Sequence, residues 1–338
     1  MGPGKDTPIV AELAERKRLS GKESDREICQ LTITAPVPFD YEPGDWLGIL
    51  PKNSPEFVEK FLKQLGASGE EPVAVRGMDG KIPLRAALAD HWEIGRVNPE
   101  CGNLAGVIET LLPTLKSLQP RMYSIASSPL TDPNSVQLVV ATETYQNTDG
   151  EKIFGVASGY LNRRLRVGDS LRCYPVKSRF RLPEKGEVDI IMVGPGTGIA
   201  PFVGFLGQRW RERSGGKKVG RSWLFFGDRH QRTDFIFRET LEDYLREGLL
   251  SRLDLAFSRD QEQKIYVQDR ILENGAELYR WIETGAHFYV CGNADRMAKD
   301  VEMALVAIFA LHGGLTRETA LARVEELRRS RHYQKDVY

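Results

Sequence analysis

A hydrophobic run that passes directly into a glycine-rich turn is the strongest constraint on the fold. Residues 188–193 (VDIIMV) have the composition of a buried β-strand, and residues 194–198 (GPGTG) separate them from a helical pattern that extends through Trp210. A strand, a glycine-rich turn and a helix in this order are the setting of a dinucleotide-binding turn. The turn departs from the usual G-x-G-x-x-G and has no P-loop lysine, so a purely structural turn is the alternative.

The same alternation of strand and helix continues after this turn. We expect strands at residues 222–227, 253–258 and 287–291, and a helix at residues 240–245. Alternating strands and helices predict an α/β domain with a parallel sheet, whose ligand lies at the carboxyl ends of the strands. We assign this domain to residues 184–338.

The first half of the chain has a different pattern. Short segments rich in β-branched residues, separated by Gly, Pro and Asp, predict strands at residues 28–35, 46–50, 135–144 and 170–175. Many short strands with regular turns are typical of a barrel or a sandwich. We therefore expect an antiparallel β-barrel within residues 1–183.

Helical patterns interrupt this barrel at about residues 52–120. Apolar residues recur at helical spacing in residues 54–65, and the serine at the start is a suitable N-cap. Residues 104–118 predict a second helical stretch, broken at Pro113, and residues 90–103 predict a loop. The barrel is thus expected to contain a small helical insertion.

Composition excludes several classes of function. Lys plus Arg and Asp plus Glu both number 47, so no overall field attracts nucleic acid. The longest apolar run, residues 303–311, is far shorter than the roughly 20 residues that cross a bilayer. Residues 1–6 lack the apolar part of a signal peptide, which makes the cytoplasm the expected location. The four cysteines are far apart, which argues against a metal site and a disulfide framework.

The segment Arg121-Met122-Tyr123-Ser124 has the residue types that a flavin requires. Arg121 and Tyr123 project to one side of a strand, where a cation meets a pyrophosphate and an aromatic ring faces the flavin. Ser124 adds a hydroxyl. A strand with a surface arginine and a core tyrosine explains the same residues without a ligand.

Residues 155–158 (GVAS) precede a helical pattern and consist of small side chains. Small residues at a helix N-terminus allow backbone N–H groups to reach a phosphate. The alternative is that Ser158 is only the N-cap of the helix.

A third group follows the strand at residues 253–258. Ser258, Arg259, Lys264 and Tyr266 provide two cations, a hydroxyl and an aromatic ring, which suit a phosphate on an adenosine ribose. An acidic residue here would favour NAD instead, but we expect the adjacent Asp260 to point outward. Solvated surface charges are the alternative.

Cys291 ends a predicted strand at Gly292, which places its thiol at the ligand edge of the sheet. A buried cysteine is usually a small hydrophobic residue. We expect it to pack beside a nicotinamide ring rather than to act as a nucleophile.

Together these motifs resemble, in order and spacing, the FAD- and NADPH-binding half of the diflavin reductases, within the ferredoxin–NADP reductase superfamily. The flavoprotein (alpha) subunits of bacterial NADPH-sulfite reductases are the most similar group. The resemblance is close from residue 120 to residue 338, above all at residues 224–258, 266–269 and 333–338. The FMN-binding flavodoxin domain of those enzymes has no room here, their helical insertion is shortened, and Asn293 replaces an aspartate.

The resemblance implies roles for individual residues. The hydride path is expected to lie among Ser124, Cys291 and Asp336, and the ring of Tyr338 is expected to cover the flavin. The residues implied in FAD binding are Arg121, Tyr123, Ser124, Thr142, Tyr145, Gly155, Val156, Ala157, Ser158 and Tyr338. Those implied in NADPH binding are Thr197, Gly198, Arg229, Ser258, Arg259, Lys264, Tyr266, Gln268 and Met297.

The function implied by the resemblance is transfer of electrons from NADPH through FAD to a separate protein, either a flavodoxin-like FMN protein or a sulfite reductase haemoprotein. A stand-alone ferredoxin or flavodoxin reductase is the nearer alternative, and a non-catalytic assembly subunit is the more distant one. Residues 317–331 predict a surface helix whose basic end suits an acidic carrier, although a basic helix C-terminus also complements the helix dipole.

Overall fold

The computed structural model describes residues 2–95, 110–146, 150 and 152–338. The chain divides into two compact units. One contains residues 1–14, 48–123 and 140–174, and the other contains residues 15–47, 124–139 and 175–338. Each unit therefore combines stretches that are distant in sequence. The division at residues 183 and 184 stays a prediction.

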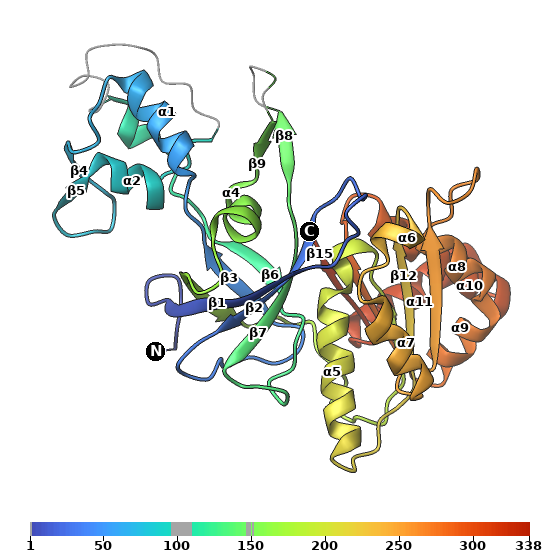
Figure 1. Cartoon of the computed structure of the whole chain (residues 1–338). Helices are drawn as coiled ribbons and strands as arrows, with labels where there is room; N and C mark the ends of the chain where they lie inside the picture. The colour runs from blue at the N-terminus through green and yellow to red at the C-terminus, as the bar shows by residue number, and fades with distance from the viewer. Residues whose placement is uncertain (1, 96–109, 147–149, 151) are drawn as a thin grey trace. The chain divides into compact units, whose positions relative to one another are not determined.

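Six strands from the first half of the chain form one sheet (Figure 1): β1 (Ile9–Arg18), β2 (Ile28–Thr34), β3 (Trp46–Leu50), β6 (Arg121–Ser124), β7 (Ser135–Ala141) and β10 (Ser170–Val176). Their order is β6-β3-β10-β1-β2-β7, and β1 runs antiparallel to β10. An antiparallel bridge between Ile125 and Leu138 joins the residue after β6 to β7, the opposite end of the sheet. The sheet thus closes on itself, as expected for a barrel.

The barrel strands form because their apolar residues alternate. In β1, Ile9, Ala11 and Leu13 are buried, whereas Val10 and Glu12 between them are exposed. Successive side chains of a strand point to opposite faces, so this period of two buries one face.

The helical insertion has a core of its own. Its elements are α1 (Pro55–Leu65), β4 (Pro72–Ala74), β5 (Lys81–Pro83), α2 (Leu84–Asp90) and a 3-10 helix (Leu112–Thr114). Ser54 caps α1 as expected, because its hydroxyl accepts a hydrogen bond from the backbone N–H of Phe57 at 3.1 Å. Phe61, Leu62 and Leu88 are among the buried residues. Of the helix expected at residues 104–118, residues 110–118 are described, and their helical part ends at Thr114 rather than at residue 118. Of the loop expected at residues 90–103, only residues 90–95 are described.

A group of short elements lies between β7 and β10. They are β8 (Thr144–Gln146), β9 (Lys152–Phe154), α4 (Val156–Gly159) and a π-helix (Tyr160–Arg164). The strand expected at residues 135–144 is therefore two strands, since β7 ends at Ala141. β8 and β9 pair antiparallel.

The second half of the chain forms the expected α/β domain. Its five strands are β11 (Ile190–Val193), β12 (Ser222–Asp228), β13 (Arg252–Phe257), β14 (His287–Gly292) and β15 (Tyr333–Val337). Their order is β13-β12-β11-β14-β15, and all four neighbouring pairs are parallel. β15 adds a strand that sequence reasoning did not predict.

Helices cover both faces of this sheet (Figure 1): α5 (Ala200–Ser214), α6 (Gln231–Asp234), α7 (Arg238–Arg246), α8 (Val267–Glu273), α9 (Gly275–Glu283), α10 (Met297–Gly313) and α11 (Arg317–Arg329). Ile191 and Val193 share one hydrophobic cluster with residues of α8 to α11. Phe205 of α5 packs edge-on against Tyr289, with 5.3 Å between ring centroids. The predicted fold class, an antiparallel barrel followed by a parallel α/β sheet, is confirmed.

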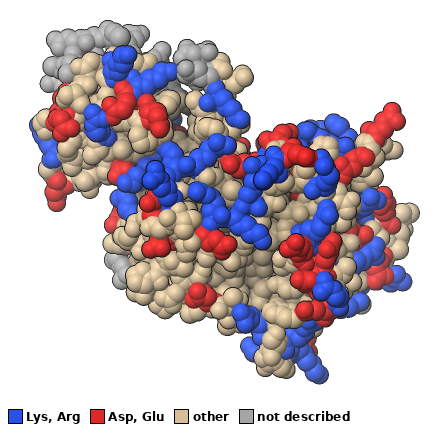
Figure 2. Space-filling model, viewed as in Figure 1, with Lys and Arg blue, Asp and Glu red and all other residues tan. Residues whose placement is uncertain are grey.

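The surface is of mixed charge, in line with 47 basic and 47 acidic residues. Figure 2 shows Lys and Arg side chains interspersed with Asp and Glu on the visible face. Within the described residues, no helix combines the length and the apolar character needed to cross a membrane. Nor does that part of the chain bring three or more His, Cys, Asp or Glu side chains together as a metal site.

Candidate functional site

The three residues expected along the hydride path lie together. β14 and β15 are parallel neighbours, and their register places Cys291 opposite Asp336. The hydroxyl of Ser124 donates a hydrogen bond to Asp336 Oδ2 at 2.9 Å, and the Cys291 thiol lies 3.8 Å from the same oxygen. Residues from the end of β6 and from two strands of the parallel sheet thus surround one carboxylate.

Trp46 completes this cluster, and sequence reasoning assigned it only to a strand. Its indole N–H lies 3.1 Å and 3.2 Å from the two carboxylate oxygens of Asp336. Burial raises the pKa of Asp336 above its usual value, although the hydrogen bonds from Trp46, Ser124 and Cys291 act in the opposite direction. No local motif marks Trp46, because its partner lies at the other end of the chain.

The Cys291 thiol is fully buried, and burial raises its pKa well above the usual value. The adjacent Asp336 carboxylate acts in the same direction. The thiol therefore stays protonated at neutral pH and is a poor nucleophile, in line with the packing role that we expected.

The glycine-rich turn packs directly against this cluster. After β11 the chain forms a short 3-10 helix (Gly196–Ile199), and Gly196 has a positive φ of 57°. Gly198 has no room for a side chain, because a Cβ atom would collide with the backbone carbonyl of Cys291. The turn therefore lies at the carboxyl ends of β11 and β14, where a parallel sheet binds ligands.

The C-terminal residue is held over this turn by its backbone. Tyr338 N–H donates to Gly292 O at 3.1 Å, and Tyr338 O accepts from Ala294 N–H at 3.0 Å. Its phenol oxygen lies 2.9 Å from the Thr197 hydroxyl, while the side chain as a whole is 64% exposed. The position of the last aromatic ring is thus defined by contacts at both ends of the residue. That it covers a flavin stays a prediction.

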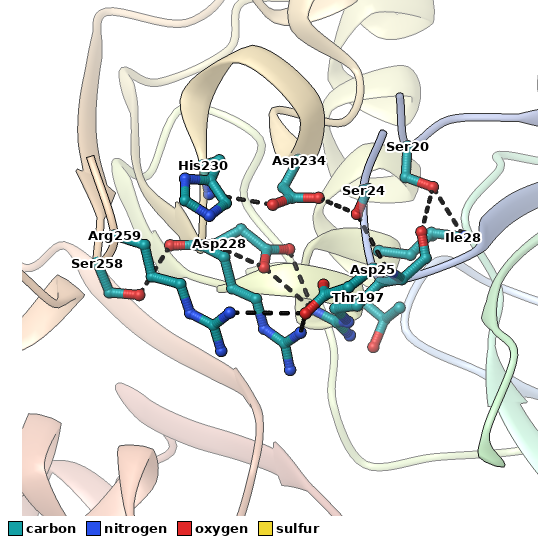
Figure 3. A network of polar contacts seen from close by, with 12 residues as sticks. Ser20, Ser24, Asp25, Ile28, Thr197, Asp228, His230, Asp234, Ser258 and Arg259 are labelled. Carbon is teal, nitrogen blue, oxygen red and sulfur yellow. Dashed lines mark hydrogen bonds and ion pairs between the residues drawn. The ribbon is translucent and has the colours of Figure 1, made fainter. Parts of the chain in front are cut away.

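Arg229, expected near the nicotinamide-side phosphates, and Arg259, expected at the phosphate that distinguishes NADPH, both lie beside Asp25 (Figure 3). The backbone N–H of Arg259 donates to Arg229 O at 2.9 Å, which joins the segments after β12 and β13. Both guanidinium groups approach the carboxylate of Asp25, Arg229 at 2.5 Å and Arg259 at 3.5 Å. The hydrogen bond from Arg229 is the main reason that the pKa of Asp25 is lowered.

Sequence reasoning assigned no residue between β1 and β2 to this site, yet two lie in it. The first is Asp25. The second is Arg26, whose guanidinium pairs with the buried carboxylate of Asp228 at 3.0 Å, next to Gly196. Their partners are about 200 positions away in the chain, so no local pattern signals them.

Asp260 is exposed, and the expectation that it points away from the nucleotide stays a prediction. Its carboxylate accepts a hydrogen bond from the Gln231 backbone N–H at 2.7 Å and lies 2.9 Å from His230 Nδ1. The free N–H groups at the start of α6 explain this orientation, because a carboxylate satisfies them.

The other residues expected to bind the nucleotide lie on the segments that follow β13 and β14. Ser258 donates from its backbone to Asp228 O at 3.0 Å, and Lys264 and Tyr266 are exposed on the segment that leads to α8. Gln268 lies in the first turn of α8, and Met297 starts α10 with its methyl group beside Gly292.

Arg121 and Tyr123 occupy alternate positions of β6, as expected. The Arg121 guanidinium donates to Gln119 O at 2.8 Å and lies 3.4 Å from Glu93 Oε1. Its side chain is 39% exposed, so it remains accessible to an anion. Burial raises the pKa of the Tyr123 phenol, which keeps it neutral.

Ser158 is not the N-cap of the helix, so that alternative explanation was wrong. Gly155 is the N-cap of α4, and Ser158 lies inside the helix, where its hydroxyl accepts from the Glu143 backbone N–H at 3.0 Å. Thr142 accepts from the Asn162 side chain at 2.9 Å, and Tyr145 on β8 is 38% exposed. The first-turn N–H groups of Val156 and Ala157 have no side-chain cap.

Comparison with known protein families matches two segments. Residues 88–160 match the FAD binding domain, and residues 192–303 match the oxidoreductase NAD-binding domain. The first contains the Arg121 and Gly155 segments, and the second contains the glycine-rich turn, Arg259 and Cys291.

Curated relatives match almost the whole chain. The sulfite reductase [NADPH] flavoprotein alpha-component of Serratia proteamaculans (strain 568) is 39% identical over 99% of this chain and 61% of its own length. Those of Yersinia pestis and Aliivibrio fischeri (strain ATCC 700601 / ES114) are each 38% identical, with the same coverage. The chain belongs to the FAD- and nicotinamide-dependent flavoprotein oxidoreductases. It spans about three-fifths of the length of these relatives.

The described residues fit the cofactors of these flavoprotein oxidoreductases. A Cβ atom on Gly155 would lie 2.8 Å from Ser158 Oγ, so the start of α4 requires a residue without a side chain. Uncapped N–H groups there, with a guanidinium on β6, form a donor set suited to a pyrophosphate. Two arginines and a serine at the ends of β12 and β13 form a second donor set, suited to a further phosphate.

Proposed function

We propose that this chain accepts a hydride from NADPH on FAD and passes the electrons to a separate acceptor protein. The observation that carries the proposal is the cluster of Trp46, Ser124, Cys291 and Asp336 directly beside the glycine-rich turn. A buried carboxylate that orients a hydroxyl at the ligand edge of a nucleotide-binding sheet serves chemistry rather than stability. The NADPH in the names of the relatives supports the choice of donor.

The nucleotide is proposed to lie across the glycine-rich turn. Thr197 and Gly198 would meet the nicotinamide-side phosphates, and Met297 would pack beside Gly292. The guanidinium groups of Arg229 and Arg259 would bind the phosphate that distinguishes NADPH from NADH. The residues assigned to the same pocket are Ser258, Lys264, Tyr266 and Gln268.

FAD is proposed to bind the first compact unit through two kinds of group, namely hydrogen-bond donors and an aromatic ring. Arg121 and the start of α4 would hold the pyrophosphate, and Tyr123 would pack on the ring system. Thr142, Tyr145, Val156, Ala157 and Ser158 complete the assigned set. The flavin supplies the redox chemistry, and the protein supplies binding and orientation.

Ser124 and Asp336 are proposed to align the reacting groups. A serine has one O–H, and here it is donated to Asp336. The lone pairs of Ser124 Oγ are thereby directed away from Asp336 and can accept an N–H group of a ligand. Fixed dipoles of this kind act without reorganisation at the moment of transfer. Tyr338 would leave its place for the nicotinamide, since the residue is 64% exposed and a single hydrogen bond, to Thr197, is found for its phenol within the described residues.

The acceptor is proposed to be a flavodoxin-like FMN protein or a sulfite reductase haemoprotein, and the relatives are named as components of sulfite reductase, which supports this choice. The chain loaded with FAD should be given NADPH together with purified flavodoxin, ferredoxin or haemoprotein in separate assays. Rapid reduction of flavodoxin or haemoprotein, and slow reduction of ferredoxin, is expected. A preference for ferredoxin would favour the stand-alone ferredoxin reductase, and reduction of none would favour the assembly subunit.

A further inference from the structure

The connection between β1 and β2 is hydrogen-bonded to the short helix α6 that follows β12. The Gly21 N–H donates to Thr233 O at 2.7 Å, and the Ser24 hydroxyl donates to Asp234 Oδ1 at 2.5 Å. Ser20 stabilises the connection internally, because its hydroxyl donates to Arg26 O at 2.7 Å and accepts from Ile28 N–H at 3.1 Å. Figure 3 shows the contacts of Ser20 and Ser24 near Asp25, whose position is therefore set by the fold.

Asp25 is placed where it neutralises the two arginines assigned to the phosphate. Its carboxylate pairs with Arg229 at 2.5 Å and with Arg259 at 3.5 Å (Figure 3). All three side chains remain partly accessible, with 57% of Asp25, 35% of Arg229 and 48% of Arg259 exposed. The pocket thus carries an internal anion at the position where an external anion is expected.

We propose that Asp25 is an intramolecular competitor of the nucleotide's 2′-phosphate for Arg229 and Arg259, and that it limits how tightly the chain binds nucleotides that carry a 2′-phosphate. This inference rests on the proposed function, because it takes the two arginines as the phosphate pocket. A phosphate dianion that approaches them meets repulsion from Asp25 and must displace its carboxylate. A ribose with a free 2′-hydroxyl carries no charge at this position and meets no such competition.

The neighbouring acids are occupied elsewhere. Asp228 pairs with Arg26, Asp234 accepts from Ser24, and Asp260 accepts from the start of α6. Glu23, two residues before Asp25, pairs with Arg232 instead. Of the ion pairs found within the described residues, only those of Asp25 involve Arg229 or Arg259, which makes Glu23 a matched control on the same connection.

The test compares two nucleotides that differ only in the 2′-phosphate, adenosine 2′,5′-bisphosphate and 5′-AMP. Their dissociation constants should be measured by titration calorimetry with the full chain, for the natural protein, Asp25→Asn and Glu23→Gln. Removal of one partly exposed charge near a dianion should tighten binding of the bisphosphate by roughly fivefold. Binding of 5′-AMP by Asp25→Asn, and of both nucleotides by Glu23→Gln, should change by less than about twofold.

Two further variants strengthen the test. Asp25→Ser removes the carboxylate with a different geometry and should show the same tightening, which separates the loss of charge from any rearrangement caused by asparagine. In an Arg259→Ala background the effect of Asp25→Asn should shrink, because the competition has lost one of its two cations.

The outcomes distinguish this inference from the proposed function. If the natural chain favours the bisphosphate and Asp25→Asn leaves that preference unchanged or lowers it, the competitor role is overturned while the phosphate pocket stands. If neither the natural chain nor Asp25→Asn binds the bisphosphate more tightly than 5′-AMP, the phosphate pocket itself is misassigned, which contradicts this inference and that part of the proposed function.

Discussion

Ser124 donates its hydroxyl hydrogen to Asp336 across 2.9 Å, although the two residues are 212 positions apart. The contact joins the end of β6 to β15, the last strand of the parallel sheet. It also orients Ser124, since the indole of Trp46 occupies the same carboxylate and holds it in place. A hydroxyl with its donor direction fixed presents only its acceptor side to a ligand.

Replacement of Ser124 by alanine tests this orientation. We expect Ser124→Ala to lower the rate of flavin reduction by NADPH by about 100-fold, as loss of a preorganised hydrogen bond does at other active sites. The KM for NADPH should stay within about twofold, because the phosphate contacts are unaffected. Rapid-mixing absorbance measurements give the rate. Ser124→Thr keeps a hydroxyl and should recover part of it, whereas equal loss in both variants would indicate a packing role.

The assigned phosphate pocket predicts a change in coenzyme preference. Arg259→Ala should raise the KM for NADPH roughly 10- to 100-fold, since a charge-assisted hydrogen bond contributes about 1.5–3 kcal/mol. The KM for NADH should hardly change. Steady-state assays with an artificial acceptor measure both values. Arg232→Ala, which removes an exposed arginine paired with Glu23, is the control and should affect neither coenzyme.

Deletion of Tyr338 should improve the use of NADH. The ring is expected to compete with nicotinamide for the flavin face, so its removal favours the more weakly bound coenzyme. Turnover of NADH with an artificial acceptor should rise, measured against the natural chain. Thr197→Ala, which removes only the partner of the phenol at 2.9 Å, should have a smaller effect. Unchanged NADH turnover after the deletion would argue that the ring is no lid.

His287 makes stability depend on pH. Burial, together with the nearby His332, Arg209 and Arg331, lowers its pKa from 6.5 to about 4. The folded protein therefore binds a proton at His287 less readily than the unfolded chain does, and stability decreases as pH falls from 6.5 toward 4. His287→Phe should reduce this decrease, because no proton is taken up at this site on unfolding.

Urea unfolding at about pH 7 and about pH 5 measures how much His287 contributes to the pH dependence of the free energy of unfolding. The loss of free energy of unfolding between these two conditions should be smaller in His287→Phe than in the natural chain. An equal loss in both proteins would show that other groups cause the acid sensitivity.

The sequence was sufficient for the parts of the fold that local patterns determine. The strand at residues 188–193 was predictable because an uninterrupted apolar run ends at glycine, and α1 was predictable because Ser54 precedes a helical period. β15 was missed, since the segment YQKDV has two apolar residues among five and lies at the edge of the sheet.

The candidate site likewise contains residues that could be predicted from the sequence and residues that could not. Ser124, Cys291 and Asp336 were predictable from a family resemblance, and the fold brings them together. Asp25 and Trp46 were not predictable, because their roles arise from partners more than 200 positions away. The contact of Asp260 with the start of α6 was not predictable either, because a free backbone N–H group of Gln231 is its partner.

The most direct test of the whole account is anaerobic titration of the purified chain with NADPH, followed by flavin absorbance. We expect about one FAD per chain, bleached by a single equivalent of NADPH and far more slowly by NADH. A chain that binds no flavin, or whose flavin keeps its yellow colour in excess NADPH, would contradict the proposed electron transfer.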